Sequence, residues 1–139
     1  MRLEELEVSG FRNLARQNIS FGPQVNLLTG QNGQGKTSLI EAVFVLSHGK
    51  SFRGAKIKEL AAWPEQTAAE SICTIRGLFA TADGKKEVLC RVSGAKRSIK
   101  INGKAVENAS AFYGQTRSVV FTPDELQIVK GPPSLRRHF

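Results

Sequence analysis

The residues with the most specific chemistry lie in one glycine-rich run in the N-terminal third of the chain. The run has glycine at positions 30, 33 and 35 and ends in a lysine followed by two hydroxyl residues: Gly30-Gln31-Asn32-Gly33-Gln34-Gly35-Lys36-Thr37-Ser38. Without Cβ atoms, such a backbone can turn tightly and approach an anion closely. Successive N–H groups from Asn32 through Ser38 can then point inward around a phosphate. The spacing is that of a P-loop, and it predicts a nucleoside triphosphate site.

The last residues of this run have individual roles in such a site. Lys36 would place its positive charge on the β- and γ-phosphates of ATP, and the Thr37 hydroxyl would bind Mg²⁺. Hydrolysis also requires an acidic residue at a second strand end. Asp124 and Glu125 follow a predicted strand, but they are better explained as charges at a helix N-terminus. We therefore predict ATP binding and assign no catalytic residue; a glycine-rich turn without a ligand is the alternative.

The elements that must position this loop follow from hydrophobic spacing. Alternating apolar residues predict two strands joined by a turn, at 2–9 and 15–21. A short strand at 25–29 should lead into the P-loop. The run 38–46 is apolar nearly all round, so it should form a helix packed inside a layered fold, with Gly49 as its C-terminal stop.

The second half of the chain predicts a series of hairpins. Three strands are expected, with tight turns between them that carry glycine: 72–79, 87–92 and 98–101. A last strand at 118–121 should run into a helix capped by Thr122. Another helix starts at Ser134 and is cut at Phe139, so we expect a partial domain, a fragment of a longer protein.

Composition bounds the class of protein. The chain has 139 residues, of which 40% are hydrophobic and 23% charged, enough for a folded core. No apolar run reaches the roughly 18 residues of a membrane span, and no signal peptide is evident, so we expect a cytoplasmic protein without a membrane partner. Cys73 and Cys90 lie in strand-like runs and are expected to be buried free thiols.

The charge balance points to nucleic acid as a partner. The formal net charge is +8 and the pI is near 9.9, which raises the local concentration of polyanions. Basic residues cluster at 50–58 and 91–104, and the candidate DNA-binding residues are Lys96, Arg97 and Lys100. Strand alternation places Lys100 opposite Ile99 and Ile101. Aromatic interleaving is absent, which favours contact with a duplex or junction backbone over base stacking. Ordinary solvated lysines are the alternative.

Several segments together resemble a known family. The turn Gly10-Phe11-Arg12-Asn13 and the P-loop resemble the ATPase heads of SMC and ABC-like DNA-repair proteins. Further stretches are similar to the RecF family of bacterial recombinational repair: Ser47-His48-Gly49-Lys50-Ser51-Phe52-Arg53, Lys100-Ile101-Asn102-Gly103-Lys104, Val120-Phe121-Thr122-Pro123-Asp124-Glu125-Leu126 and Val129-Lys130-Gly131-Pro132-Pro133-Ser134-Leu135-Arg136-Arg137-His138-Phe139. The similarity runs over the whole chain.

This resemblance implies an α/β fold of the ABC/SMC-head type, a mixed sheet with an antiparallel meander. Residues 1–139 would be the N-terminal lobe of that head. The resemblance also implies an ATP-dependent homodimer that acts at single-strand gaps or junctions or on linear duplex, with RecO and RecR as partners and a role in DNA replication, repair and the SOS response. Arg12 would approach the bound nucleotide and Asn13 would shape the turn. The whole protein would be a weak ATPase and this part of it inactive.

The sequence departs from the family pattern at one point and leaves two other functions open. The glutamine that many such heads carry after a strand is replaced by Thr122-Pro123-Asp124-Glu125, and Gln115 is an uncertain substitute. A P-loop kinase or nucleotide transferase would need an acceptor pocket and lid arginines, for which Arg136 and Arg137 are weak candidates. A structural lobe with an incomplete, empty nucleotide site is the third interpretation.

Overall fold

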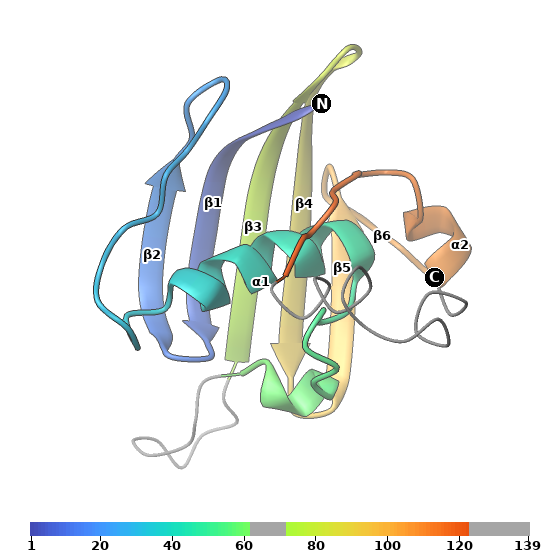
Figure 1. Cartoon of the computed structure of the whole chain (residues 1–139). Coiled ribbons are helices and arrows are strands. Elements are labelled where there is room, and N and C mark those ends of the chain that lie inside the picture. Colours follow the sequence, from blue (N-terminus) through green and yellow to red (C-terminus); the bar gives the residue numbers. More distant parts are fainter. Residues whose placement is uncertain (62–71, 123–139) are drawn as a thin grey trace, which may run out of the picture.

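One helix lies across one face of an antiparallel sheet in this computed structural model, which describes residues 1–61 and 72–122. The sheet has six strands in the order β2-β1-β3-β4-β5-β6 (Figure 1). The strands are β1 (Arg2–Phe11), β2 (Leu14–Ser20), β3 (Ile72–Thr81), β4 (Gly84–Ser93), β5 (Lys96–Ile101) and β6 (Lys104–Ala105). The helical elements are α1 (Lys36–His48), the 3₁₀ turn η1 (Ile57–Glu59) and the short α2 (Ala109–Phe112).

The hairpins form where the sequence predicts them. β3, β4, β5 and β6 are joined in turn by two-residue connections at 82–83, 94–95 and 102–103, and each neighbouring pair is antiparallel. Gly84, Gly94 and Gly103 have positive φ angles, which suits these tight turns. All strand pairs among the described residues are antiparallel, so those residues form the meander but none of the parallel part of a mixed sheet.

Helix α1 packs on the sheet along one stripe. Its buried residues recur at helical spacing: Ser38, Glu41, Ala42, Val45, Leu46 and Ser47. They meet inward-facing side chains of β1, β3 and β4, such as Leu6, Ile75 and Val88, in a single hydrophobic core. Gly77 lets the helix come close, because a Cβ atom there would lie 2.7 Å from a methyl carbon of Leu46. The predicted stop is confirmed: Gly49 ends α1 in the left-handed conformation, and its N–H bonds to the Val45 carbonyl.

Two predicted strands are absent. Residues 25–29 and 118–121 run without strand hydrogen bonding, and Val25 and Val119 are 90% and 97% exposed. A strand requires a neighbour for its backbone N–H and C=O groups, and no described strand lies beside either segment. Both segments instead border a groove on α1, where Ile40 is half-exposed, so the helix is covered on one side rather than all round. The helix predicted from 122–125 and the one from Ser134 fall mostly outside the described residues.

The two cysteines are buried free thiols, as the sequence predicts. Cys73 on β3 and Cys90 on β4 lie on the helix side of the sheet and are fully buried. Burial raises the pKa of Cys73 to about 12 and that of Cys90 to about 11. Among the described residues, no helix is long and apolar enough to cross a membrane.

These pKa values predict very low thiol reactivity, since the thiolate is the reactive form. Native protein at pH 8 should give almost no signal with a thiol-specific disulfide reagent, whereas two thiols per chain should react in denatured protein. Fast labelling of the native protein at a rate independent of denaturant would contradict this burial.

Candidate nucleotide-binding site

The P-loop wraps the N-terminus of α1, as the motif requires. Gly35 is the N-cap residue with φ of 91°, a conformation that favours glycine. A Cβ atom at this position would also lie only 2.5 Å from a methyl carbon of Leu14 on β2. Gly35 therefore permits both the turn into the helix and the contact between the P-loop and the first hairpin.

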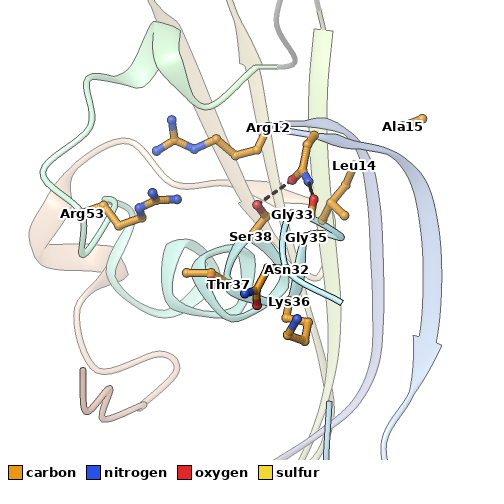
Figure 2. Close-up of a pocket in the computed structure, with 11 residues that line it drawn as sticks. Arg12, Leu14, Ala15, Asn32, Gly33, Gly35, Lys36, Thr37, Ser38 and Arg53 are labelled. Carbon is orange, nitrogen blue, oxygen red and sulfur yellow. Dashed lines mark hydrogen bonds between the residues drawn. The ribbon is translucent and has the colours of Figure 1, made fainter. Parts of the chain in front are cut away.

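A cavity of about 650 Å³ opens at this helix end (Figure 2). Eight of the predicted nucleotide-binding residues line it: Arg12, Asn13, Asn32, Gly33, Gly35, Lys36, Thr37 and Ser38. The other three make contacts within the loop: the Gln34 side-chain oxygen accepts a hydrogen bond from the Gln31 N–H, and Gly30 accepts one from Lys36. The strand expected before the P-loop is missing, yet the loop and helix are formed.

The electrostatics of the cavity favour an anion. No side chain caps the N-terminus of α1, and its first turn contains no acidic residue. The first N–H groups of a helix carry partial positive charge, so an uncapped end attracts a negative ligand. Lys36 adds a full charge beside it, with its Nζ donating to the carbonyl oxygens of Gly30 and Gln31 at 2.7 and 2.6 Å. The donors and charge present here fit a phosphate group.

The β1–β2 turn is attached directly to the P-loop. The Asn13 side-chain nitrogen donates to the Gly33 carbonyl oxygen at 2.7 Å, and its oxygen accepts from the Ser38 hydroxyl at 2.8 Å. These two bonds join the turn to both sides of the helix N-terminus. Asn13 was expected to shape the turn; its side chain instead bonds to the P-loop and to the first turn of α1.

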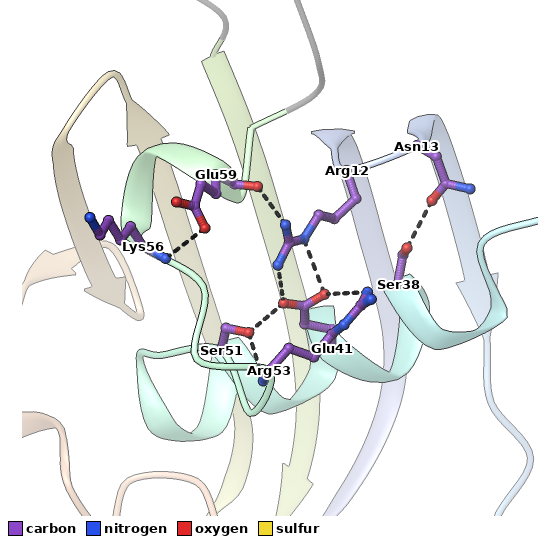
Figure 3. A network of polar contacts seen from close by, with 8 residues as sticks. All are labelled: Arg12, Asn13, Ser38, Glu41, Ser51, Arg53, Lys56 and Glu59. Carbon is purple, nitrogen blue, oxygen red and sulfur yellow. Dashed lines mark hydrogen bonds and ion pairs between the residues drawn. The ribbon is translucent and has the colours of Figure 1, made fainter. Parts of the chain in front are cut away.

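Arg12 borders the cavity, but its guanidinium is held by protein groups (Figure 3). Its Nε and Nη2 donate to the two carboxylate oxygens of Glu41 at 3.1 and 2.6 Å, and its Nη1 donates to the Glu59 carbonyl oxygen at 2.8 Å. Its backbone is left-handed, with φ of 54°, and its N–H bonds to the Leu60 carbonyl. A direct contact between Arg12 and a nucleotide therefore stays a prediction.

Glu41, which holds two of the arginines that line the cavity, was not singled out by the sequence. Its carboxylate is completely buried and also accepts a hydrogen bond from the Ser51 hydroxyl, while Arg53 Nη1 lies 3.7 Å away. A signal existed: Glu41 is the one charged side chain in the otherwise apolar run 38–46, at a position of the buried stripe. A buried carboxylate requires a cation, so this position predicts a partner arginine.

Arg53 is the less constrained of the two arginines that meet Glu41. Its side chain is 52% exposed, whereas that of Arg12 is 16% exposed, and it also lines the cavity. The sequence placed Arg53 in a basic cluster suited to DNA. The fold brings it to the cavity at the N-terminus of α1, because the chain after α1 turns back at Ser51, whose hydroxyl accepts a bond from the Arg53 N–H.

The three candidate DNA-binding residues do not share one surface. Lys100 and Lys96 lie on the face of β5 turned away from α1, and Lys100 is opposite Ile99 as predicted. Arg97 lies on the helix side, next to Gly49: if Gly49 carried a Cβ atom, that atom would be 3.2 Å from Arg97 Nη1. At the C-terminal end of α1 its charge complements the helix dipole. Gln115 does not line the cavity; its side-chain and backbone oxygens accept bonds from Lys86 at 3.1 Å.

A P-loop at a helix N-terminus, carried by a helix on an antiparallel sheet, defines the N-terminal part of a nucleotide-binding ATPase head. Comparison with known sequences gives the family: residues 2–126 match the RecF/RecN/SMC N-terminal domain. This chain belongs to that family.

Individual relatives agree with this assignment. The chain is 37% identical over its full length to the DNA replication and repair protein RecF of Halalkalibacterium halodurans, covering 36% of that protein. It is 38% identical to RecF of Geobacter sulfurreducens, covering all of this chain and 37% of that protein. The chain thus spans little more than a third of the length of these relatives.

Solved structures show the same fold. A structure of the recombination mediator protein RecF–ATP in the RecFOR pathway superposes with a TM-score of 0.84 at 38% identity, over 99% of this chain and 36% of that one. An SMC ATPase structure, from work on ATP-driven dimerisation and DNA-stimulated activation, superposes with a TM-score of 0.79 at 21% identity. The alignment covers 99% of this chain and 96% of the SMC chain.

Proposed function

We propose that this chain binds MgATP as the N-terminal lobe of an ATP-dependent DNA-repair ATPase. The observation that carries the proposal is the uncapped N-terminus of α1, which opens with Lys36 into a cavity of about 650 Å³. That volume lies within the roughly 300–1,000 Å³ typical of small-molecule sites. Backbone N–H groups of the loop would bind the phosphate oxygens, and Lys36 would neutralise their charge. Support also comes from a relative solved as RecF–ATP.

Three further residues complete the proposed site. The exposed Thr37 hydroxyl lies in the first turn of α1 and would hold Mg²⁺, whose charge stabilises the phosphates when it is bound. Arg53 would supply a second cation, since Glu41 has one carboxylate charge for two guanidinium groups. Asn13 would hold the loop in place through its hydrogen bonds to the Gly33 carbonyl and the Ser38 hydroxyl.

At the level of the whole protein, we propose an ATP-dependent DNA-binding function in recombinational repair and replication at single-strand gaps. The names of the relatives support this function over a kinase or transferase. ATP held between two heads would drive homodimerisation, as the SMC structure's description says of that protein. RecO and RecR are the proposed protein partners.

Turnover by these 139 residues alone should be absent. Among the described residues, no carboxylate lines the cavity to hold a metal or to position water for attack on a phosphate. A phosphate-release assay with purified chain and excess MgATP should show no more than background, while a fluorescent ATP analogue should still bind and be displaced by ATP. Sustained hydrolysis that disappears in Lys36→Ala would contradict this prediction, and failure to bind the analogue would overturn the proposed function.

A further inference from the structure

The sheet face opposite α1 carries charges in two distinct groups. On β2, β1, β3 and β4, cations and carboxylates alternate across neighbouring strands. Arg16 Nη2 lies 3.8 Å from Glu7 Oε1, and the other carboxylate oxygen of Glu7 lies 3.7 Å from Arg76 Nη1. Arg76 Nη2 in turn lies 2.7 Å from Glu87 Oε2. Lys85 is likewise paired with Glu4 at 3.2 Å. Charge on this part of the face is thus largely balanced by neighbours within the sheet.

The β4–β5 end of the same face is different. It presents Arg91, Lys96 and Lys100, which we call the basic strip, and all three are exposed. Strand register fixes their arrangement: Arg91 faces Ser98, the residue midway between Lys96 and Lys100. Within the described parts of the chain, no carboxylate lies within ion-pair distance of any of the three. The positive charges of these three side chains are therefore not neutralised by carboxylates of the described residues.

We propose that the basic strip binds the phosphate backbone of duplex DNA. Charge complementarity is the main argument. When DNA binds to cations that have no partner in the protein, counterions are released from the DNA, and this release favours binding. Geometry agrees with it. Four residues of strand separate Lys96 from Lys100 by about 13 Å, close to the axial rise of about four nucleotides at 3.4 Å each. Arg91 lies between them on the adjacent strand.

The composition of this face favours duplex backbone over single-stranded bases. Its apolar members near the strip, such as Leu78 and Leu89, are aliphatic, and Phe79 points to the helix side, where it is buried. Base stacking requires aromatic platforms. The strip keeps two of the three candidates predicted from the sequence, Lys96 and Lys100. Arg91 takes the place of the third, Arg97, which lies beside α1. This inference rests on the proposed DNA-repair function and assigns it a surface.

The test is a charge reversal in the full chain, Arg91→Glu with Lys96→Glu and Lys100→Glu. We expect the negative slope of log affinity for a duplex against log salt to become shallower by about 3, with at least a tenfold weaker affinity at low salt. Binding of a fluorescent ATP analogue should be unchanged, because the strip lies on the other side of the sheet from the P-loop. The matched control reverses three exposed lysines on the helix side: Lys50, Lys58 and Lys104.

The outcomes separate this proposal from the proposed function. If the wild-type chain binds duplex and the strip variant binds equally well, the assigned surface is wrong and the function stands. If the control variant loses as much affinity as the strip variant, net charge alone explains binding and the surface is again wrong. If the wild-type chain binds ATP but no DNA, both the strip and the DNA-binding part of the function are overturned. Strip-dependent binding to anionic phospholipid vesicles without DNA binding would also overturn the inference.

Discussion

Replacing Glu41 with glutamine is expected to lower the free energy of unfolding by about 3–5 kcal/mol, the typical cost of leaving a buried charge without its partner. The carboxylate is fully buried and accepts bonds from Arg12 and Ser51, with Arg53 nearby. Glutamine keeps the shape but can satisfy only part of this network, and it leaves the Arg12 guanidinium without a counter-charge. Urea unfolding followed by circular dichroism measures the change.

A matched substitution controls for the chemical change itself. Glu7→Gln also removes a carboxylate next to two arginines, but Glu7 is 39% exposed and its ion pairs are 3.7 and 3.8 Å long. Exposed pairs contribute about 0–1 kcal/mol, so Glu7→Gln should change stability by less than about 1 kcal/mol. Arg53→Ala should have a similarly small effect on stability. Equal destabilisation by Glu41→Gln and Glu7→Gln would show that burial of Glu41 contributes nothing specific.

The sequence predicts those parts of the fold that depend on local chain geometry. Two-residue turns with a glycine in or directly after them, together with alternating apolar residues, define the hairpins of β3, β4 and β5, and Gly49 ends α1 where expected. Segments 25–29 and 118–121 have the same strand-like composition, but strand formation depends on a pairing partner, which composition does not specify. A propensity for β structure is therefore necessary for a strand and not sufficient.

The candidate site divides in the same way. The P-loop is a contiguous motif, so its residues and its place at a helix N-terminus could be predicted. The Glu41–Arg12 pair joins residues 29 apart in sequence, and a contact of that kind depends on how α1 packs against the hairpin. Arg97 is exposed, but strand alternation places it on the helix side of the sheet with Ile99 and away from Lys100. Lys96, Arg97 and Lys100 are close in sequence, but the period of two of a strand divides them between the two faces of the sheet.

Lys36→Ala is expected to have the opposite profile to Glu41→Gln, with a large loss of ATP affinity and little loss of stability. Among the residues that the structure describes, its ammonium donates hydrogen bonds only to the carbonyl oxygens of Gly30 and Gln31, in an exposed loop, so we expect the fold not to depend on it. A charge-assisted hydrogen bond contributes roughly 1.5–3 kcal/mol. Since 1.4 kcal/mol is tenfold in affinity, the loss should be about 10- to 100-fold.

Equilibrium titration of MgATP against wild-type and variant chains measures this loss, with Lys58→Ala as the matched control. Lys58 is an exposed lysine in η1 that does not line the cavity, so its removal should leave affinity within about twofold. If Lys36→Ala binds MgATP as tightly as wild type, the cavity at α1 is not the phosphate site. If it unfolds instead, the two bonds of Lys36 hold the loop. Thr37→Val should weaken MgATP binding only when Mg²⁺ is present, because the hydroxyl of Thr37 is the proposed metal ligand; this separates the metal's contribution from that of the lysine.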